Sequence, residues 1–151
     1  MKHAITSFIT LLLLIGCSSS NSDNQDVADF SSLNGNQFVM EVDRVLGAAD
    51  VDFPSDALEE NDYETIDDGA DYTVTFSENG HTVSIEPGNM QGQKTEDDGE
   101  STTYELDAGT FAGGRFVIQD DNGSFDAELT LYGSGVPIVQ SERGYLVPVE
   151  D

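Results

Sequence analysis

Three acidic segments contain the residue types that bind calcium in protein loops. They are Asp67-Asp68-Gly69, Glu96-Asp97-Asp98-Gly99 and Asp120-Asp121-Asn122-Gly123. An EF-hand loop needs oxygen ligands at alternate positions, glycine at the sixth position and glutamate at the twelfth. Counted from Asp120, the sixth residue is Phe125, and no register of the three segments fits the pattern. We therefore interpret them as acidic turns and predict no specific metal site.

Residues suited to nucleophilic catalysis are scarce. Cys17 is the only cysteine, and His81 is the only histidine beyond the N-terminal apolar segment. His81 flanks the turn signal Asn79-Gly80, where an exposed polar side chain needs no catalytic explanation. The chain has no Gly-x-Ser-x-Gly segment. Among 30 Asp and Glu residues some pair always falls at the spacing of a glycosidase by chance. We expect no catalytic residue, no cofactor and no enzymatic activity.

Basic residues are rare and therefore informative. The chain has 5 Lys and Arg against 30 Asp and Glu, which gives a formal net charge of −25. Because nucleic-acid binding needs clustered Lys and Arg, this charge excludes a nucleic-acid partner. The acids are spread along the chain, which favours a solvating role over a cation-binding surface. Arg115 follows Gly113-Gly114, and we predict that its guanidinium pairs with a carboxylate or, alternatively, contacts a ligand.

Two hairpins are predicted from Asn-Gly turns between alternating apolar and polar residues. Residues 72–85 (YTVTFSENGHTVSI) pair Phe76 with Val83 and place the apolar side chains on one face. Residues 115–131 (RFVIQDDNGSFDAELTL) do the same around Asn122-Gly123 and place Phe116 opposite Leu129.

A third hairpin is predicted between residues 136–140 and 145–149, with Gly144 in the left-handed position of its loop. Pro148 lacks a backbone N–H and indicates a sheet edge there. Residues 38–42 and 102–106 are two further strands. The fold class that follows is all-β, an antiparallel barrel or sandwich of about eight strands joined by hairpins. Residues 47–71 are an acidic insertion, which in a compact domain is typical of a lid, a flap or a mobile segment.

The N-terminus has the organisation of an export signal. Lys2 supplies a positive charge and residues 4–15 an apolar run, which is shorter than the roughly 20 residues that span a membrane. Leu14-Ile15-Gly16-Cys17 resembles the lipobox of bacterial lipoproteins. The resemblance implies that residues 1–16 are removed, that Cys17 carries acyl chains such as palmitate, and that residues 17–29 form a flexible tether. Ser18 after the cysteine favours the outer membrane if the cell is Gram-negative.

Residues 30–151 are expected to form a single domain. Its size and strand pattern resemble the lipocalin-like domains of bacterial lipoproteins, with residues 33–38 (LNGNQF) where these often have Gly-x-Trp; this chain has no tryptophan. The resemblance implies a non-enzymatic, lipid-anchored protein of the cell envelope that binds a small apolar ligand. The alternative is an acidic structural or interaction module that binds another envelope protein, bridged by cations.

Overall fold

The computed structural model describes residues 29–46, 62–134 and 138–149. In this part of the chain a short 3-10 helix precedes nine strands, and all pairings between strands are antiparallel. The elements are η1 (Phe30–Leu33), β1 (Gln37–Leu46), β2 (Tyr63–Thr65), β3 (Asp71–Phe76), β4 (Thr82–Glu86), β5 (Met90–Asp97), β6 (Ser101–Asp107), β7 (Gly113–Asp121), β8 (Ser124–Tyr132) and β9 (Ile138–Pro148).

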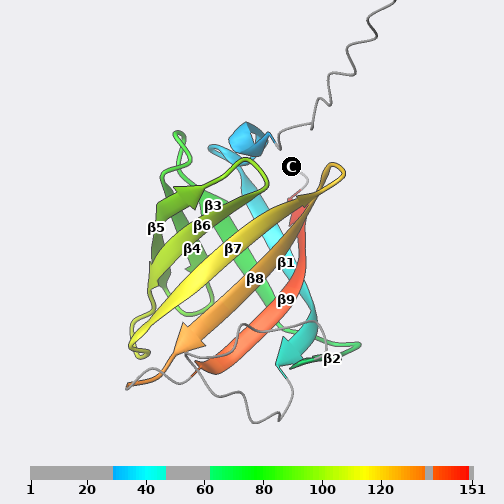
Figure 1. Ribbon diagram of the computed structural model, residues 1–151, viewed down its shortest axis with the longest axis vertical. Coiled ribbons are helices and arrows are strands. Elements are labelled where there is room, and N and C mark those ends of the chain that lie inside the picture. The colour runs from blue at the N-terminus through cyan, green and yellow to red at the C-terminus, as the bar shows by residue number, and fades with distance from the viewer. Residues whose placement is uncertain (1–28, 47–61, 135–137, 150–151) are drawn as a thin grey trace, which may run out of the picture.

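Eight of the strands form a closed barrel (Figure 1). They follow in the order β1-β3-β4-β5-β6-β7-β8-β9, and β9 pairs back onto β1. The ninth strand, β2, pairs with residues 44–46 of β1. The prediction of an all-β fold with about eight strands is confirmed, and the fold is a barrel rather than a sandwich. Closure gives each of the eight strands two neighbours and removes a free sheet edge.

The hairpin β3–β4 has the predicted register. Phe76 pairs with Val83, and Val74 pairs with Ile85. The Ser77 amide donates to the Thr82 carbonyl at 3.0 Å, and residues 78–81 form the loop. In this loop Gly80 alone has a positive φ, of 66°, so it is not the primed two-residue turn.

The hairpin β7–β8 also has the predicted register, with Phe116 opposite Leu129. Its turn residues Asn122 and Gly123 have φ values of 53° and 93°, as a primed two-residue turn requires. The Gly123 amide donates to the Asp120 carboxylate at 3.1 Å. The local sequence therefore explains both the position and the type of this turn.

The third predicted hairpin is wrong, because β9 is one continuous strand. It pairs with β8 on one side and with β1 on the other. Gly144 lies inside this strand, and a Cβ added there would stand 1.9 Å from the Glu41 carbonyl oxygen of β1. Glycine is therefore needed here because β1 and β9, the two strands that close the barrel, approach closely, and not because the chain turns. Pro148 lies beyond Leu146, where β9 pairs with β1 alone.

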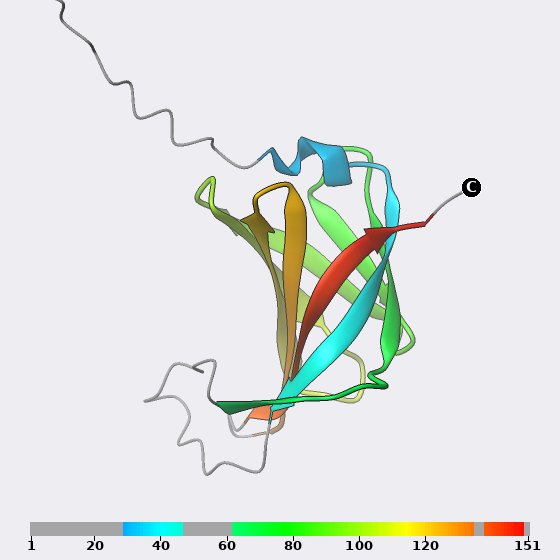
Figure 2. The same cartoon turned by 90° about the vertical axis from the view of Figure 1, so that its right-hand side faces the viewer.

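The barrel interior is filled by the protein's own apolar side chains. Phe76 touches Phe38 and Tyr104, with ring centroids 5.8 and 5.9 Å apart. At one end η1 covers the barrel and buries Leu33 and Phe30. The Asp29 carboxylate caps η1 by accepting from the Ser31 amide at 3.0 Å. β2 lies at the opposite end (Figure 2).

Several predicted segments fall outside the described residues. These are the signal segment 1–16, Cys17 with the tether up to residue 28, and residues 47–61 of the acidic insertion. The rest of the insertion contains β2 and the connection to β3, which packs against β1: a Cβ added to Gly69 would stand 2.0 Å from the Val42 carbonyl oxygen.

Candidate functional site

A groove of about 660 Å³ lies on the barrel at the η1 end. We call it the lateral groove. Phe38 and Leu146, which are 6% and 7% exposed, and the half-buried Phe125 contribute apolar surface. Polar residues from the chain between η1 and β1 and from the β7–β8 turn complete it. The lining residues are Ser32, Gly35, Asn36, Gln37, Phe38, Gly123, Ser124, Phe125, Leu146, Pro148 and Val149.

The groove forms where β8, β9 and β1 reach the η1 end of the barrel. The β8–β9 ladder stops at the pair Phe125 and Leu146, whereas β9 continues to Pro148 along β1. Phe30 of η1 packs on Phe125 with ring centroids 5.8 Å apart. The hairpin tip thus leans on η1 while β9 stays with β1, and the groove lies between them.

The chemistry of the groove contrasts with the rest of the chain. None of the eleven described residues that line it is charged, although 23% of all residues are Asp, Glu, Lys or Arg. Its volume lies within the roughly 300–1,000 Å³ of small-molecule sites, which are mostly apolar with a few polar groups. The groove suits an uncharged or mostly apolar ligand, with Asn36, Gln37 and Ser124 able to hydrogen-bond at its rim.

Arg115, singled out from the sequence, belongs to a network on the outer face of the barrel. Its Nη2 lies 3.4 Å from Glu128 Oε1, and Arg143 binds the other carboxylate oxygen more closely, at 2.9 and 3.0 Å. Thr130 Oγ1 donates to Glu128 Oε1 at 3.2 Å. We call these residues the outer ion-pair network. Arg115 thus pairs with a carboxylate, but Glu128 receives its shorter contacts from Arg143.

The network continues to β2 through aromatic and hydroxyl contacts. The Arg143 guanidinium stands 3.9 Å from the centroid of the Tyr63 ring. Tyr63 Oη and Ser141 Oγ are 2.8 Å apart, and burial raises the pKa of Tyr63. A cation over an aromatic face is stabilising, particularly where water is excluded. These contacts tie β2 to the barrel wall.

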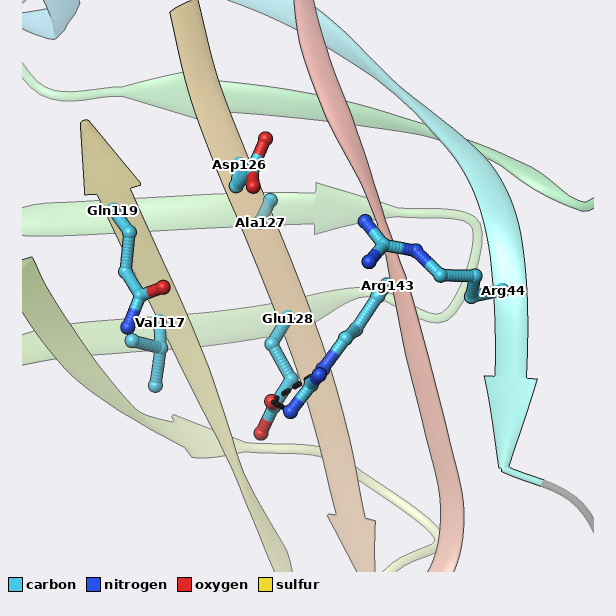
Figure 3. A pocket seen from close by; sticks show the side chains of 7 residues that line it. All are labelled: Arg44, Val117, Gln119, Asp126, Ala127, Glu128 and Arg143. Atoms are coloured by element: carbon cyan, nitrogen blue, oxygen red, sulfur yellow. Dashed lines mark hydrogen bonds and ion pairs between the residues drawn. The ribbon is translucent and has the colours of Figure 1, made fainter. Parts of the chain in front are cut away.

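A recess of about 150 Å³ opens beside this network (Figure 3). Arg44 projects toward it from β1, and Arg143 reaches Glu128 along the barrel wall. Asp126 and Glu128 balance the two guanidinium charges, so the recess has no excess of either sign. Its volume is about half that of the smaller ligand sites. We assign the recess a structural role.

The other residues considered from the sequence do not converge. His81 is exposed in the β3–β4 loop, and the acidic segments lie in separate turns. Across residues 29–46, 62–134 and 138–149, no group of three or more His, Cys, Asp or Glu side chains is arranged to hold a metal ion. Cys17 lies outside the described residues.

A polar group inside the barrel was missed from the sequence. Tyr72 on β3 and Gln140 on β9 form a hydrogen bond in which Gln140 Nε2 donates to Tyr72 Oη at 3.2 Å. Burial raises the pKa of Tyr72 well above its usual range, and the neighbouring Glu142 carboxylate raises this pKa further. We call these residues the interior polar group. Gln140 and Glu142 were assigned to the incorrect third hairpin, so their inward direction was not predicted.

Fold and sites together define a closed eight-stranded antiparallel barrel with a groove at one end whose described lining residues are uncharged. This arrangement fits the expected lipocalin-like architecture. No family model, no curated protein and no solved structure matches the chain. In the described parts of the chain, no helix is long and apolar enough to cross a membrane.

Proposed function

We propose that the protein is a non-enzymatic lipoprotein of the cell envelope that binds a small apolar ligand in the lateral groove. The observation that carries the proposal is that the eleven described residues lining the groove are uncharged, in a chain with a net charge of −25. Desolvating a charged wall would oppose the binding of an apolar molecule, and a neutral wall avoids that cost.

Membrane attachment rests on the lipobox Leu14-Ile15-Gly16-Cys17. Acyl chains on Cys17 would hold the protein on a membrane, in Gram-negative cells the outer one. Asp29, the first described residue, precedes η1, so the groove lies at the barrel end where the proposed tether would join the domain. An anchored barrel would then present its groove near the membrane, where apolar molecules are concentrated.

The anchor is tested by growing cells with labelled palmitate. The wild-type chain should incorporate the label and sediment with membranes. Cys17→Ser should do neither. Label on the Cys17→Ser chain, or an unlabelled wild type, would refute attachment at this residue.

The ligand site is tested with a matched pair of substitutions on exposed valines. Val149, which is 44% exposed, lines the groove, and Val139, which is 50% exposed, lies at the other end of β9. With the neutral dye N-phenyl-1-naphthylamine, Val149→Asp should weaken binding about tenfold or more, because a carboxylate placed against an apolar ligand must be desolvated. Val139→Asp should change the affinity less than about twofold.

Native mass spectrometry of the protein released from its own envelope would identify the ligand class. A copurified apolar mass that is lost with Val149→Asp supports the proposal. An empty wild-type protein and equal dye binding by both variants would favour the alternative, an acidic module that binds an envelope protein.

A further inference from the structure

Glu142 is a buried carboxylate with one unsatisfied oxygen. Its position on β9, opposite Leu129 and Val45, directs the side chain into the barrel, where the residue is 9% exposed. The Tyr72 hydroxyl neighbours the carboxylate, and Glu142 Oε2 is buried and has no hydrogen-bond partner. Buried acceptors in native proteins are almost always satisfied, by protein, by water or by a ligand. This oxygen therefore marks a position for a donor.

The surroundings of Glu142 supply hydrogen bonds but no positive charge. Tyr72, which neighbours the carboxylate, is neutral, and so is Gln140, which donates to Tyr72. Arg143, the next residue along β9, is directed to the outer face and binds Glu128. A buried carboxylate is expensive unless a cation pairs with it. A water molecule would satisfy the oxygen without neutralising the charge.

The position is distinct from the lateral groove. Gln140 is half-buried and lies nearer than Glu142 to the barrel end opposite η1. Val45 and Ile66, both partly buried, pack against the core at that end. Apolar side chains and the carboxylate are therefore neighbours at this end of the barrel.

We propose that Glu142 binds the ammonium group of a small organic amine, with its alkyl part among the apolar residues of this barrel end. One unsatisfied oxygen suits a compact ammonium, whereas a guanidinium binds both oxygens of a carboxylate in a fork. A divalent metal ion would need several oxygen ligands, and the described residues provide no such group. Tyr72 and Gln140 are positioning residues that orient the carboxylate.

The test uses n-butylammonium and n-butanol as matched probes on the whole chain carrying Cys17→Ser. Binding is followed by NMR of the ¹³C-labelled Tyr72 ring, which reports events at Glu142, in salt high enough to screen the surface acids. The wild type should bind the ammonium about tenfold or more tightly than the alcohol, as expected for a hydrogen bond to a charged group. Equal affinities, or a Tyr72 resonance that neither probe moves, would overturn the proposal and leave a water as the occupant.

Two variants separate this site from the other acids. Glu142→Gln keeps the shape and removes the charge, so ammonium binding should fall about tenfold or more, while butanol binding stays within about twofold. Glu105→Gln, on an exposed residue of β6, should leave both unchanged. Equal loss in the two variants, or no loss in Glu142→Gln, would show adventitious binding only. If Glu142→Gln fails to fold, the test rests on the wild type alone, in which the Tyr72 resonance should report tighter binding of n-butylammonium than of n-butanol.

Discussion

Gly144→Ala should push apart β1 and β9, the pair of strands that closes the barrel. An added Cβ would stand 1.9 Å from the Glu41 carbonyl oxygen and 2.9 Å from Val42 Cα, both backbone atoms of β1. Real Cβ contacts essentially never fall below 3.0 Å, so β1 and β9 must separate by about 1 Å or more. Interstrand hydrogen bonds near 2.9 Å would then lengthen beyond useful range.

The expected cost is about 3 kcal/mol. It combines two or three weakened hydrogen bonds of about 1 kcal/mol each with the strain of an overpacked contact. The loss corresponds to a fall in Tm of roughly 10 °C for a domain of this size. Equilibrium urea unfolding measures it directly.

Gly109→Ala is the control for the chemical change itself. Gly109 has a φ of 62° and nothing within 4 Å of an added Cβ, so it tests the strain of a left-handed alanine without a clash. That strain costs about 1 kcal/mol. If Gly144→Ala destabilised the protein no more than Gly109→Ala does, the close approach of β1 and β9 would not be what requires glycine.

Three further predictions concern charge and pH. Burial raises the pKa of Tyr104 to about 12, against 10.0 ordinarily, so the folded state holds this proton more tightly than the unfolded chain. The free energy of unfolding is therefore retained below pH 10 and should decline as the pH rises toward 12. In urea unfolding across this range, Tyr104→Phe should make the decline less steep. An unchanged slope of the unfolding free energy against pH would contradict this prediction. Glu128→Gln should destabilise the protein by about 1–2 kcal/mol, because Arg143 loses its carboxylate partner. A double-mutant cycle with Arg143→Met measures the coupling energy between the two side chains. A coupling energy of zero would contradict the ion pair. Sodium chloride should raise the Tm by screening the net charge of −25, and an unchanged Tm between low and physiological salt would show that self-repulsion is negligible.

The local pattern was sufficient for much of the fold. The turn Asn122-Gly123 was predicted with its register because both residues favour the left-handed conformation of a primed turn. The register of β3–β4 was also predicted, although its loop is wider, since the apolar side chains of both strands must share one face. These features depend on residues close together in the chain.

Gly144 shows where local reasoning failed. A glycine near the end of a β-rich chain fits a turn and a tight strand contact equally well. The choice depended on Glu41 and Val42, about a hundred residues earlier in the chain, whose backbone occupies the space of a side chain. The inward position of Glu142 followed from the same choice.

By itself, the sequence determined the strand-forming pattern, two hairpins, the acidic charge and the predicted lipobox, because each is a property of neighbouring residues or of composition. Only the tertiary structure decided that the sheet closes through β1 and β9, and that Phe38, Phe125 and Leu146 line one groove. It also decided that Tyr72 meets Gln140 and Glu142 inside the barrel. These contacts join distant segments, and the geometry of barrel closure selects them.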